Sequence, residues 1–343
     1  MRRRFPRPDP PRDGVGQAPR TDAPKVGIIG AGLSGLMAGR VLQDHGLNVT
    51  IFDKGRRPGG RANTREHGLH QFDHGAQFFT VRDPLIRPFL DSWLREGVVA
   101  EWKSSLVRIQ GEEVEAARDS TRYVGVPGMI ALAEHLAKDL DVWSHLRVER
   151  LQKEEGGWIP HAPGAPRLGP FDWVIVAVPA PQSVPLLDSA PHLQELARRV
   201  DMAPCWAGMY VFSEPLDLAF DGAFLSGQAL SWVARDSSKP GRPDAESWVL
   251  HAGPEWTRDH WDRGREEVAE ALAREFGQRF GPLPEVSFSR AHRWAYAQAS
   301  DPSPGGTLYD AERQIGACGD WCQGGRMEGA LLSGMEVAGR ILG

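Results

Sequence analysis

Three glycines near the amino terminus have the spacing that lets backbone approach a diphosphate. The segment Gly30-Ala31-Gly32-Leu33-Ser34-Gly35 follows an apolar run that begins at Val26. Between a strand and a helix, the first glycine permits the tight turn and the second lets backbone approach a pyrophosphate. The third glycine allows close packing of the helix on the strand. Free N–H groups at the helix start favour negative charge. The pattern predicts a dinucleotide site.

An acidic residue follows at the distance where ribose is recognised. A second strand is expected from Asn48 to Phe52, and it stops on Asp53, roughly 20 residues after the glycines. A carboxylate at this position accepts hydrogen bonds from ribose hydroxyls. A lone GxGxxG also occurs in unrelated glycine-rich turns. Here the strand, the helix, the second strand and the acidic residue occur in the order and at the spacing that the motif requires, which strengthens the prediction.

The loop after Asp53 indicates which dinucleotide is bound. It reads Lys54-Gly55-Arg56-Arg57-Pro58-Gly59-Gly60-Arg61. A nicotinamide dehydrogenase would continue here into another crossover helix. This loop instead supplies further N–H donors and guanidinium groups for phosphate oxygens. The loop resembles the second fingerprint of the large FAD-binding family that includes the amine oxidases, and this resemblance favours FAD. The alternative is a solvated basic turn.

Two later segments have residue types suited to contact with a flat ring. In the segment 72–80, small residues flanked by Gln77 and aromatic side chains would let backbone lie against a ring, with an amide available. A β-turn inside a sheet is an equal alternative. Near the carboxyl terminus, a strand over 315–318 precedes Asp320 and a helix. The start of that helix would direct its positive end at the flavin pyrimidine, and Asp320 would reach the ribityl or phosphate region.

Residues for acid–base or metal chemistry form no recognisable group. Eleven histidines are present, and His74, His251 and His292 are the best candidates. A structural or pocket-shaping role fits each of them better. Cys318 and Cys322 lie in a glycine-rich turn without companion ligands. We therefore expect no catalytic side chain and no metal.

A parallel sheet must position these residues, and a second unit interrupts it. A continuous apolar strand over 171–179 is typical of a buried parallel strand and resumes the sheet late in the chain. Segments 205–212, 230–235, 248–252 and 286–294 read as strands of an insertion, with a helix over 265–280. A further amphipathic helix is expected over 83–96, with Leu85, Ile86, Phe89, Leu90 and Trp93 facing inward.

The predicted fold class is α/β, with a Rossmann-like FAD-binding domain of the amine-oxidase type and an inserted α+β substrate domain on a mixed or antiparallel sheet. The FAD-binding domain is expected to comprise residues 25–80, 125–182 and 308–343. The substrate domain is expected to comprise residues 81–124 and 183–307. Residues 1–24 are basic and proline-rich, which predicts a disordered tail.

Composition narrows the class of protein. At 343 residues, with 41% hydrophobic and 25% charged residues, the chain suits two interleaved domains. A net charge of −5 argues against a general role with nucleic acid or membrane surfaces. No apolar run would span a bilayer. Three cysteines cannot form a disulfide framework, so a reducing cytoplasm is expected.

Taken together, these residues resemble the bacterial renalases, a branch of the FAD-dependent amine-oxidase superfamily, from residue 25 to residue 343. The segments that carry the resemblance are Phe72–Asp83, Trp232-Val233-Ala234-Arg235 with Lys239-Pro240, Trp248–Ala252, Ala291–Ala297 and Cys318–Gly334. The middle three separate this branch from other amine oxidases.

The resemblance implies an oxidase of isomeric dihydronicotinamide dinucleotides, whose extra hydride lies at ring C2 or C6 instead of C4. FAD would take the hydride, NAD⁺ or NADP⁺ would leave, and O₂ would be reduced to H₂O₂. With the glycine motif, it implies cofactor contacts at Gly30, Gly32, Leu33, Ser34, Gly35, Asp53, Arg61, Gln77, Phe78, Val148 (through its backbone, to adenine), Asp320 and Met327. It implies substrate contacts at Phe78, Phe79, Cys205, Trp294, Tyr296 and Ala297, with Gln77, Trp294 and Tyr296 positioning the substrate.

The implied chemistry agrees with the missing acid–base pair. Hydride loss from a dihydropyridine gives an aromatic cation directly, so positioning matters more than proton removal. Amine oxidation usually draws on a buried lysine near the flavin, and the corresponding region here reads Arg293-Trp294. The sequence departs from the renalase pattern at Phe78, at Cys205 and after Ala297. Two alternatives stay open: a flavin oxidase or desaturase of an amine or polycyclic substrate, and a sensor that binds nicotinamide dinucleotides without turnover.

Overall fold

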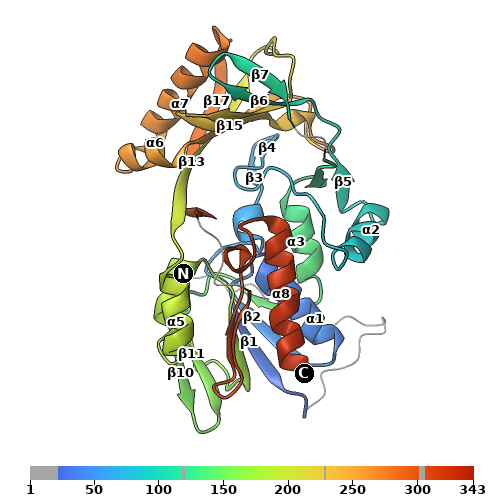
Figure 1. Ribbon diagram of the computed structural model, residues 1–343, viewed down its shortest axis with the longest axis vertical. Helices are drawn as coiled ribbons and strands as arrows, with labels where there is room; N and C mark the ends of the chain where they lie inside the picture. Colours follow the sequence, from blue (N-terminus) through green and yellow to red (C-terminus); the bar gives the residue numbers. More distant parts are fainter. Residues whose placement is uncertain (1–21, 118–119, 228, 301–305) are drawn as a thin grey trace.

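Two bodies stacked along the long axis make up the computed structural model (Figure 1). It describes residues 22–117, 120–227, 229–300 and 306–343. The tail expected at residues 1–24 therefore lies almost entirely outside the described residues. Both chain ends of the described part, and the glycine motif, belong to the lower body.

The lower body is built on a six-stranded sheet with the strand order β18-β19-β12-β1-β2-β9. All neighbouring pairs are parallel except β18 and β19. The strands are β1 (Lys25–Ile29), β2 (Asn48–Phe52), β9 (Asp141–Trp143), β12 (Trp173–Val176), β18 (Leu308–Asp310) and β19 (Ile315–Ala317). The central part of this parallel sheet confirms the predicted Rossmann-like fold.

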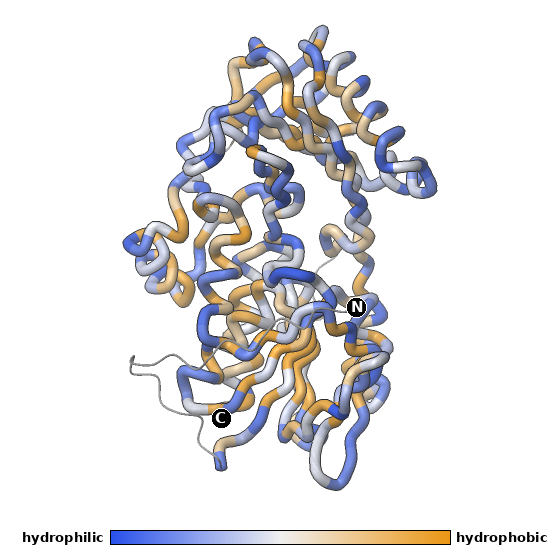
Figure 2. Tube along the Cα trace, turned by 180° about the vertical axis from the view of Figure 1, so that it is seen from behind, coloured by the Kyte–Doolittle hydropathy of each residue, from blue (hydrophilic) through white to orange (hydrophobic). Residues whose placement is uncertain are grey.

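Both faces of this sheet are covered, because successive side chains of a strand point to opposite faces. Ile28 packs with one cluster that includes helices α1 (Leu33–Asp44), α3 (Ile130–Ala137) and α8 (Met327–Leu342). Ile29 packs with a second cluster that includes β10 (Arg150–Glu154), β11 (Gly157–His161) and α5 (Pro191–Arg198). Apolar stretches accordingly run along these strands, with hydrophilic segments at the turns (Figure 2).

The upper body is a seven-stranded sheet with the order β17-β13-β16-β15-β14-β6-β7, antiparallel except where β14 meets β6. Helices α6 (Pro254–Asp259) and α7 (Arg265–Phe280) lie on its outer side (Figure 1). The strands are β6 (Leu106–Gln110), β7 (Glu113–Ala116), β13 (Met202–Phe212), β14 (Gly222–Ser226), β15 (Leu230–Arg235), β16 (Glu246–Ala252) and β17 (Val286–Ala299). This mixed sheet with its helices confirms the expected α+β insertion.

Short elements join the two bodies. They are the 3₁₀ turn η1 (Gly60–Ala62), the hairpin of β3 (Arg65–His67) and β4 (His70–Phe72), helix α2 (Arg87–Arg95), and the antiparallel pair β5 (Val99–Glu101) and β8 (Tyr123–Gly125). Helix α4 (Ala180–Ser183) and the turn η2 (Val184–Leu187) follow β12. The chain then leaves the lower body through β13 (Figure 1).

Two expectations about the elements need correction. Residues 183–200 were expected in the substrate domain, but Leu187 and Leu193 pack in the second cluster of the lower body, against the sheet. Leu85 was expected to face inward and is 61% exposed, because α2 begins only at Arg87. The helix over Arg265–Phe280 lies where it was predicted. Among the described helices, none has the length and apolarity needed to cross a membrane.

Candidate functional site

A cavity of about 2080 Å³ lies between the two bodies. Its lining comes from the glycine loops and helix α8 of the lower body and from the inner face of the upper sheet. Nearly all expected site residues line it: Gly30, Gly32, Leu33, Ser34, Asp53, Arg61, Gln77, Phe78, Phe79, Val148, Cys205, Trp294, Tyr296, Ala297, Asp320 and Met327. Gly35 is the exception, since it is buried beneath the loop.

The three glycines of the first loop face different surroundings. Gly30 has φ +115, and a Cβ there would lie 2.4 Å from the carbonyl oxygen of Ala177. A Cβ at Gly35 would lie 2.1 Å from the carbonyl oxygen of Gly30, so close packing requires glycine. A Cβ at Gly32 would meet nothing within 4 Å. Gly32 therefore opens onto free space, whereas the other two serve the turn and the packing.

A second glycine loop lies directly against the first. The Gly59 N–H donates to the Ala31 carbonyl at 2.8 Å, and Gly59 has φ +113. Asp53 accepts hydrogen bonds from the N–H groups of Ala31 at 2.7 Å and Gly55 at 2.5 Å. The carboxylate thus holds the two loops together. The backbone of Asp53 also keeps the segment that contains Val148 close, because the Leu146 N–H donates to the Asp53 carbonyl.

Arg61 and Asp320 join the first and last parts of the chain inside the cavity. The guanidinium donates to both carboxylate oxygens, at 3.0 and 2.5 Å, and to the Ala297 carbonyl at 3.0 Å. The paired geometry is the fork that guanidinium and carboxylate groups favour. These three predicted site residues therefore lie together, although they are far apart in the sequence. Met327, the first residue of α8, is also in the lining.

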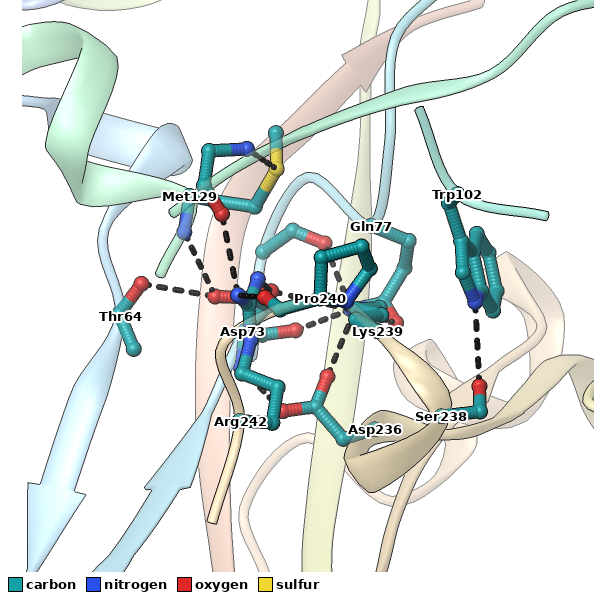
Figure 3. Close-up of polar contacts among 12 residues, drawn as sticks. Thr64, Asp73, Gln77, Trp102, Met129, Asp236, Ser238, Lys239, Pro240 and Arg242 are labelled. Carbon is teal, nitrogen blue, oxygen red and sulfur yellow. Dashed lines mark hydrogen bonds and ion pairs between the residues drawn. The ribbon is translucent and has the colours of Figure 1, made fainter. Parts of the chain in front are cut away.

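Gln77 lines the cavity, but its amide is engaged by protein groups. Its Oε1 accepts from Lys239 Nζ at 3.2 Å, while its Nε2 donates to the carbonyl oxygens of Asp73 and Gly75 (Figure 3). The Gln77 amide, which was expected to be available to a ring, is thus bound by protein groups instead. What this turn offers the cavity is its backbone, with Gly75 and Ala76 in the lining.

A buried charge network holds this turn in place. Lys239 bonds to Asp236 at 2.6 Å and to Asp73 at 3.2 Å, and Arg242 bonds to Asp73 (Figure 3). Asp73 also accepts from Thr64 Oγ1 at 2.7 Å. Burial by itself raises the pKa of Asp73, but Lys239 and Arg242 outweigh it and lower that pKa to about 2. Two carboxylates and two cations therefore neutralise one another within the core.

Aromatic side chains form one wall of the cavity. The Phe78 ring lies 5.7 Å from Trp232 and 6.3 Å from Phe224, and the Arg122 guanidinium lies over it at 5.6 Å. Phe79 differs, because its ring is only 3% exposed and packs against Tyr123 at 5.7 Å. The ring of Phe79, which was expected to contact substrate, is thus packed inside the protein, whereas the Phe78 ring packs with the aromatic wall.

Histidines and Trp294 form another part of the lining. Trp294 Nε1 donates to the His74 carbonyl at 2.9 Å, and the His292 ring lies 4.4 Å from Trp294 and 4.8 Å from His74. Burial, followed by charges that include nearby arginines, lowers the pKa of His74 to about 3 and that of His292 to about 4. Burial lowers the pKa of His251 to about 4. These rings are neutral at physiological pH.

Cys205 lies in the lining on β13 and pairs with Trp294 across the sheet. Burial raises the pKa of its thiol to about 12, so no thiolate is available for attack. Tyr296 and Ala297 follow on β17, at the edge where Arg61 binds. The four residues expected near the nicotinamide are thus brought to one side of the cavity.

Sequence reasoning missed the roles of Lys239, Arg65 and Arg290. A buried lysine was sought around Arg293-Trp294, whereas Lys239 is fully buried behind Gln77 and outside the lining. Asp236 is the only acidic partner of Lys239 that lies nearby in the sequence, since its other acidic partner, Asp73, lies 166 positions away. Arg65 and Arg290 lie on strands far apart in the sequence and both line the cavity.

The residues present fit a flavin dinucleotide. The open space over Gly32 lies next to the second glycine loop, at the start of α1, where N–H groups favour a diphosphate. Asp53 bonds to the first glycine loop through the Ala31 N–H, whereas Trp294 lies on β17 of the upper sheet and bonds to the His74 carbonyl. Leu33, Ser34, Arg61, Asp320 and Met327 line the same cavity. An elongated cofactor would thus run from Asp53 towards the aromatic residues.

Comparison with known proteins agrees with this geometry. The family described as "NAD(P)-binding Rossmann-like domain" matches residues 28–93, and the family described as "Flavin containing amine oxidoreductase" matches residues 94–342. A phytoene desaturase (neurosporene-forming) from Rhodobacter capsulatus is 47% identical over 58 residues, which cover 17% of this chain and 11% of that protein. A mitochondrial protoporphyrinogen oxidase from Nicotiana tabacum is 35% identical over 78 residues, which cover 23% and 16%. The chain thus aligns with only a small part of these relatives.

Solved structures share the whole fold. A putative protoporphyrinogen oxidase from Exiguobacterium sp. 255-15 has a TM-score of 0.74 at 13% identity, and a cyclohexylamine oxidase from Brevibacterium oxydans IH-35A has 0.72 at 14%. Each alignment covers 93% of this chain and 99% of the other. At these identities the likeness concerns the fold. The family match spans most of the chain: this protein belongs to the flavin-containing amine oxidoreductases, and FAD is its cofactor.

Proposed function

We propose that this flavin-dependent oxidoreductase oxidises isomeric dihydronicotinamide dinucleotides, with the hydride at ring C2 or C6, to NAD⁺ or NADP⁺. The observation that carries the proposal is that the buried histidines and the thiol near Trp294 are not poised to act as an acid or a base. The pKa values of His74, His251 and His292 lie at about 3 to 4, and that of Cys205 at about 12. None of these groups exchanges a proton near neutral pH.

A dihydropyridine suits such a site. Its C–H bond breaks with both electrons leaving as hydride, and the ring that remains is an aromatic cation, so no base is needed. FAD, held by Gly32, Arg61, Asp320 and Met327, would supply the hydride acceptor, and O₂ would take up the two electrons with two protons to give H₂O₂. The protein's part is to place the substrate ring, and the rings of Trp294 and Phe78 in the cavity lining are available for that purpose.

The buried lysine supports the same reading. In an amine oxidase of this family, a lysine is expected to organise water beside the flavin. Lys239 instead bonds to Asp73 and Asp236, and its side chain is fully buried away from the cavity lining. A second candidate, oxidation of an amine or a polycyclic substrate, is favoured by the aromatic wall of Phe78, Phe224 and Trp232.

The test is anaerobic mixing of the FAD-loaded protein with borohydride-reduced NAD⁺, which contains all dihydro isomers. We expect rapid loss of the visible flavin band, and no loss with benzylamine or other amines. Loss of the band with amines alone would support the second candidate. A protein that keeps FAD but is reduced by none of these compounds would be a sensor, and the proposed reaction would be wrong.

A further inference from the structure

A group of arginines lies at the histidine wall of the cavity. Arg65 begins strand β3, Arg290 lies on β17, and both line the cavity next to His292. Successive side chains along a strand alternate, so Arg290, His292 and Trp294 share one face of β17. At roughly 3.3 Å per residue, Arg290 stands about 13 Å along the strand from Trp294.

These cations have no acidic partner among the described residues. Neither Arg65 nor Arg290 makes a side-chain hydrogen bond or ion pair there, and the neighbouring Glu66 is bound to Arg57 at 3.1 Å. Burial lowers the pKa of Arg65 first, and the charges of Arg290, Arg265 and Arg56 lower it further. Like charges thus gather at the cavity without compensation, an arrangement that a bound anion would relieve.

The other arginine on this strand serves a different purpose. The Arg293 guanidinium lies 4.2 Å from the Trp261 ring centroid and donates to the Trp261 carbonyl. Arg61 is bound to Asp320. Arg65 and Arg290 therefore differ from their neighbours in having all their donors available. Planar guanidinium groups bind phosphate oxygens through two parallel hydrogen bonds.

The location suits the substrate better than the cofactor. The diphosphate of FAD is expected over Gly32, at the start of α1, whereas Arg65 lies on β3 and Arg290 on β17 of the upper sheet, both near His292. A ring held at Trp294 would direct the rest of a dinucleotide along β17. We propose that Arg65 and Arg290, with the neutral ring of His292 beside them, bind a phosphate group of the dinucleotide substrate. This inference rests on the proposed function.

The experiment compares FAD-loaded Arg65→Ala and Arg290→Ala with Arg108→Ala. Arg108 is a matched control, because it also lines the cavity but lies on β6, which is separated from β17 by the strands β13, β16, β15 and β14, with its guanidinium over the Phe224 ring at 5.6 Å. One substrate is borohydride-reduced NAD⁺, and the other is borohydride-reduced 1-methylnicotinamide, which has the ring without phosphate. The concentration for half-maximal flavin reduction and the limiting rate are measured under anaerobic conditions.

We expect each of Arg65→Ala and Arg290→Ala to raise the half-maximal concentration of the dinucleotide about tenfold or more, as loss of a charge-assisted bond would. The limiting rate, the response to the methylnicotinamide substrate and the FAD content should stay unchanged. Calorimetric titration with inorganic pyrophosphate gives an independent readout, with binding to the unaltered protein and to Arg108→Ala and weaker binding to the two other variants.

Three results would overturn the inference. Unchanged dinucleotide response in both variants would show that the arginines do not contact substrate, and the proposed function would still stand. Loss of FAD would assign them to the cofactor. An equal effect of Arg108→Ala would show a general charge effect. If no dihydro isomer reduces the unaltered protein, the proposed function fails, and the pyrophosphate titration still decides whether an anion site exists.

Discussion

Gly32 and Gly35 belong to one motif, yet the surroundings assign them opposite tasks. Space is open where Gly32 would carry a Cβ, whereas at Gly35 the Cβ would strike the Gly30 carbonyl oxygen at 2.1 Å. The conformation at Gly32, φ −74 and ψ 173, is one that any residue adopts. What Gly32 provides is therefore room for a ligand, and what Gly35 provides is contact between helix and loop.

This difference predicts separable effects of the two alanine variants. Gly32→Ala should leave the melting temperature of the apoprotein within about 2 °C of the unaltered value, because a surface change without a clash costs little. It should lower the ratio of bound flavin to protein after purification. Gly35→Ala should cost about 1–3 kcal/mol or more through overpacking. Absorbance ratios and apoprotein melts measure both, and a normal flavin content in Gly32→Ala would contradict the diphosphate path over that residue.

His74 predicts how stability depends on pH. Its ring is 2% exposed, and the folded-state pKa of about 3 lies below the ordinary value of 6.5. Below pH 6.5 this imidazole is protonated in the unfolded chain but stays neutral in the folded chain. The contribution of His74 to the free energy of unfolding is therefore complete above pH 6.5 and falls as the pH drops towards 3. Between pH 7 and pH 5 this one group should cost about 2 kcal/mol.

Urea unfolding of the protein and of His74→Phe at pH 7 and pH 5 tests this. The variant should show a smaller loss between the two pH values, because the group that titrates is absent. Equal losses in both proteins would mean that His74 is not the neutral, buried ring described above. The same neutrality implies a rate of flavin reduction that does not change between pH 6 and pH 9.

At the scale of elements, the network around Lys239 fixes the turn that carries Gln77. It connects β4, the turn after β15 and the start of α3, since Asp73 accepts from Lys239, Arg242 and the Met129 N–H. These bonds are buried, so removal of one charge leaves others uncompensated. The segment 73–77 thus owes its position to side chains that never reach the cavity.

Lys239→Met should lower the free energy of unfolding by about 3–5 kcal/mol, because Asp73 and Asp236 would lose their shared cation in the core. The control is Lys103→Met, at an exposed lysine without an ion pair among the described residues, which should change stability by less than about 0.5 kcal/mol. Denaturant unfolding of the FAD-loaded proteins measures both. Similar values for the two variants would show that the network contributes little.

Local sequence predicted the elements whose signals are local. The strand–glycine–helix unit from Lys25 and the helix over Arg265–Phe280 are examples. The hairpin of β6 and β7 was missed, because its outer strand is exposed and polar.

The sequence predicted which residues belong to the candidate site, but it did not predict which of them contact one another. Residue types placed Arg61 and Asp320 in the candidate site, the resemblance placed Trp294 there, and the cavity contains all three. Their contacts join positions more than 200 residues apart, such as Arg61 with Asp320 and His74 with Trp294. Spacing along the chain carries no information about such pairs. For the same reason the approach of Arg65 to Arg290 could not be foreseen.

At the scale of the whole molecule, the two bodies supply different groups to the cavity. The lower body offers glycine loops and Asp53, and the upper sheet offers aromatic rings, neutral histidines and cations on its inner face. Because the cavity lies between them, both parts of the chain must be folded before a ligand can be held. The account therefore predicts that one substrate molecule meets one cofactor within a single chain.

The most direct measurement is an anaerobic titration of the FAD-loaded protein with purified 1,2-dihydro-NAD, followed by assay of the NAD⁺ released. We expect loss of the flavin band with one equivalent of substrate and release of one equivalent of NAD⁺, while the ordinary 1,4-dihydro form leaves the flavin oxidised. Persistence of the oxidised flavin with the 1,2- and 1,6-dihydro isomers would contradict this expectation.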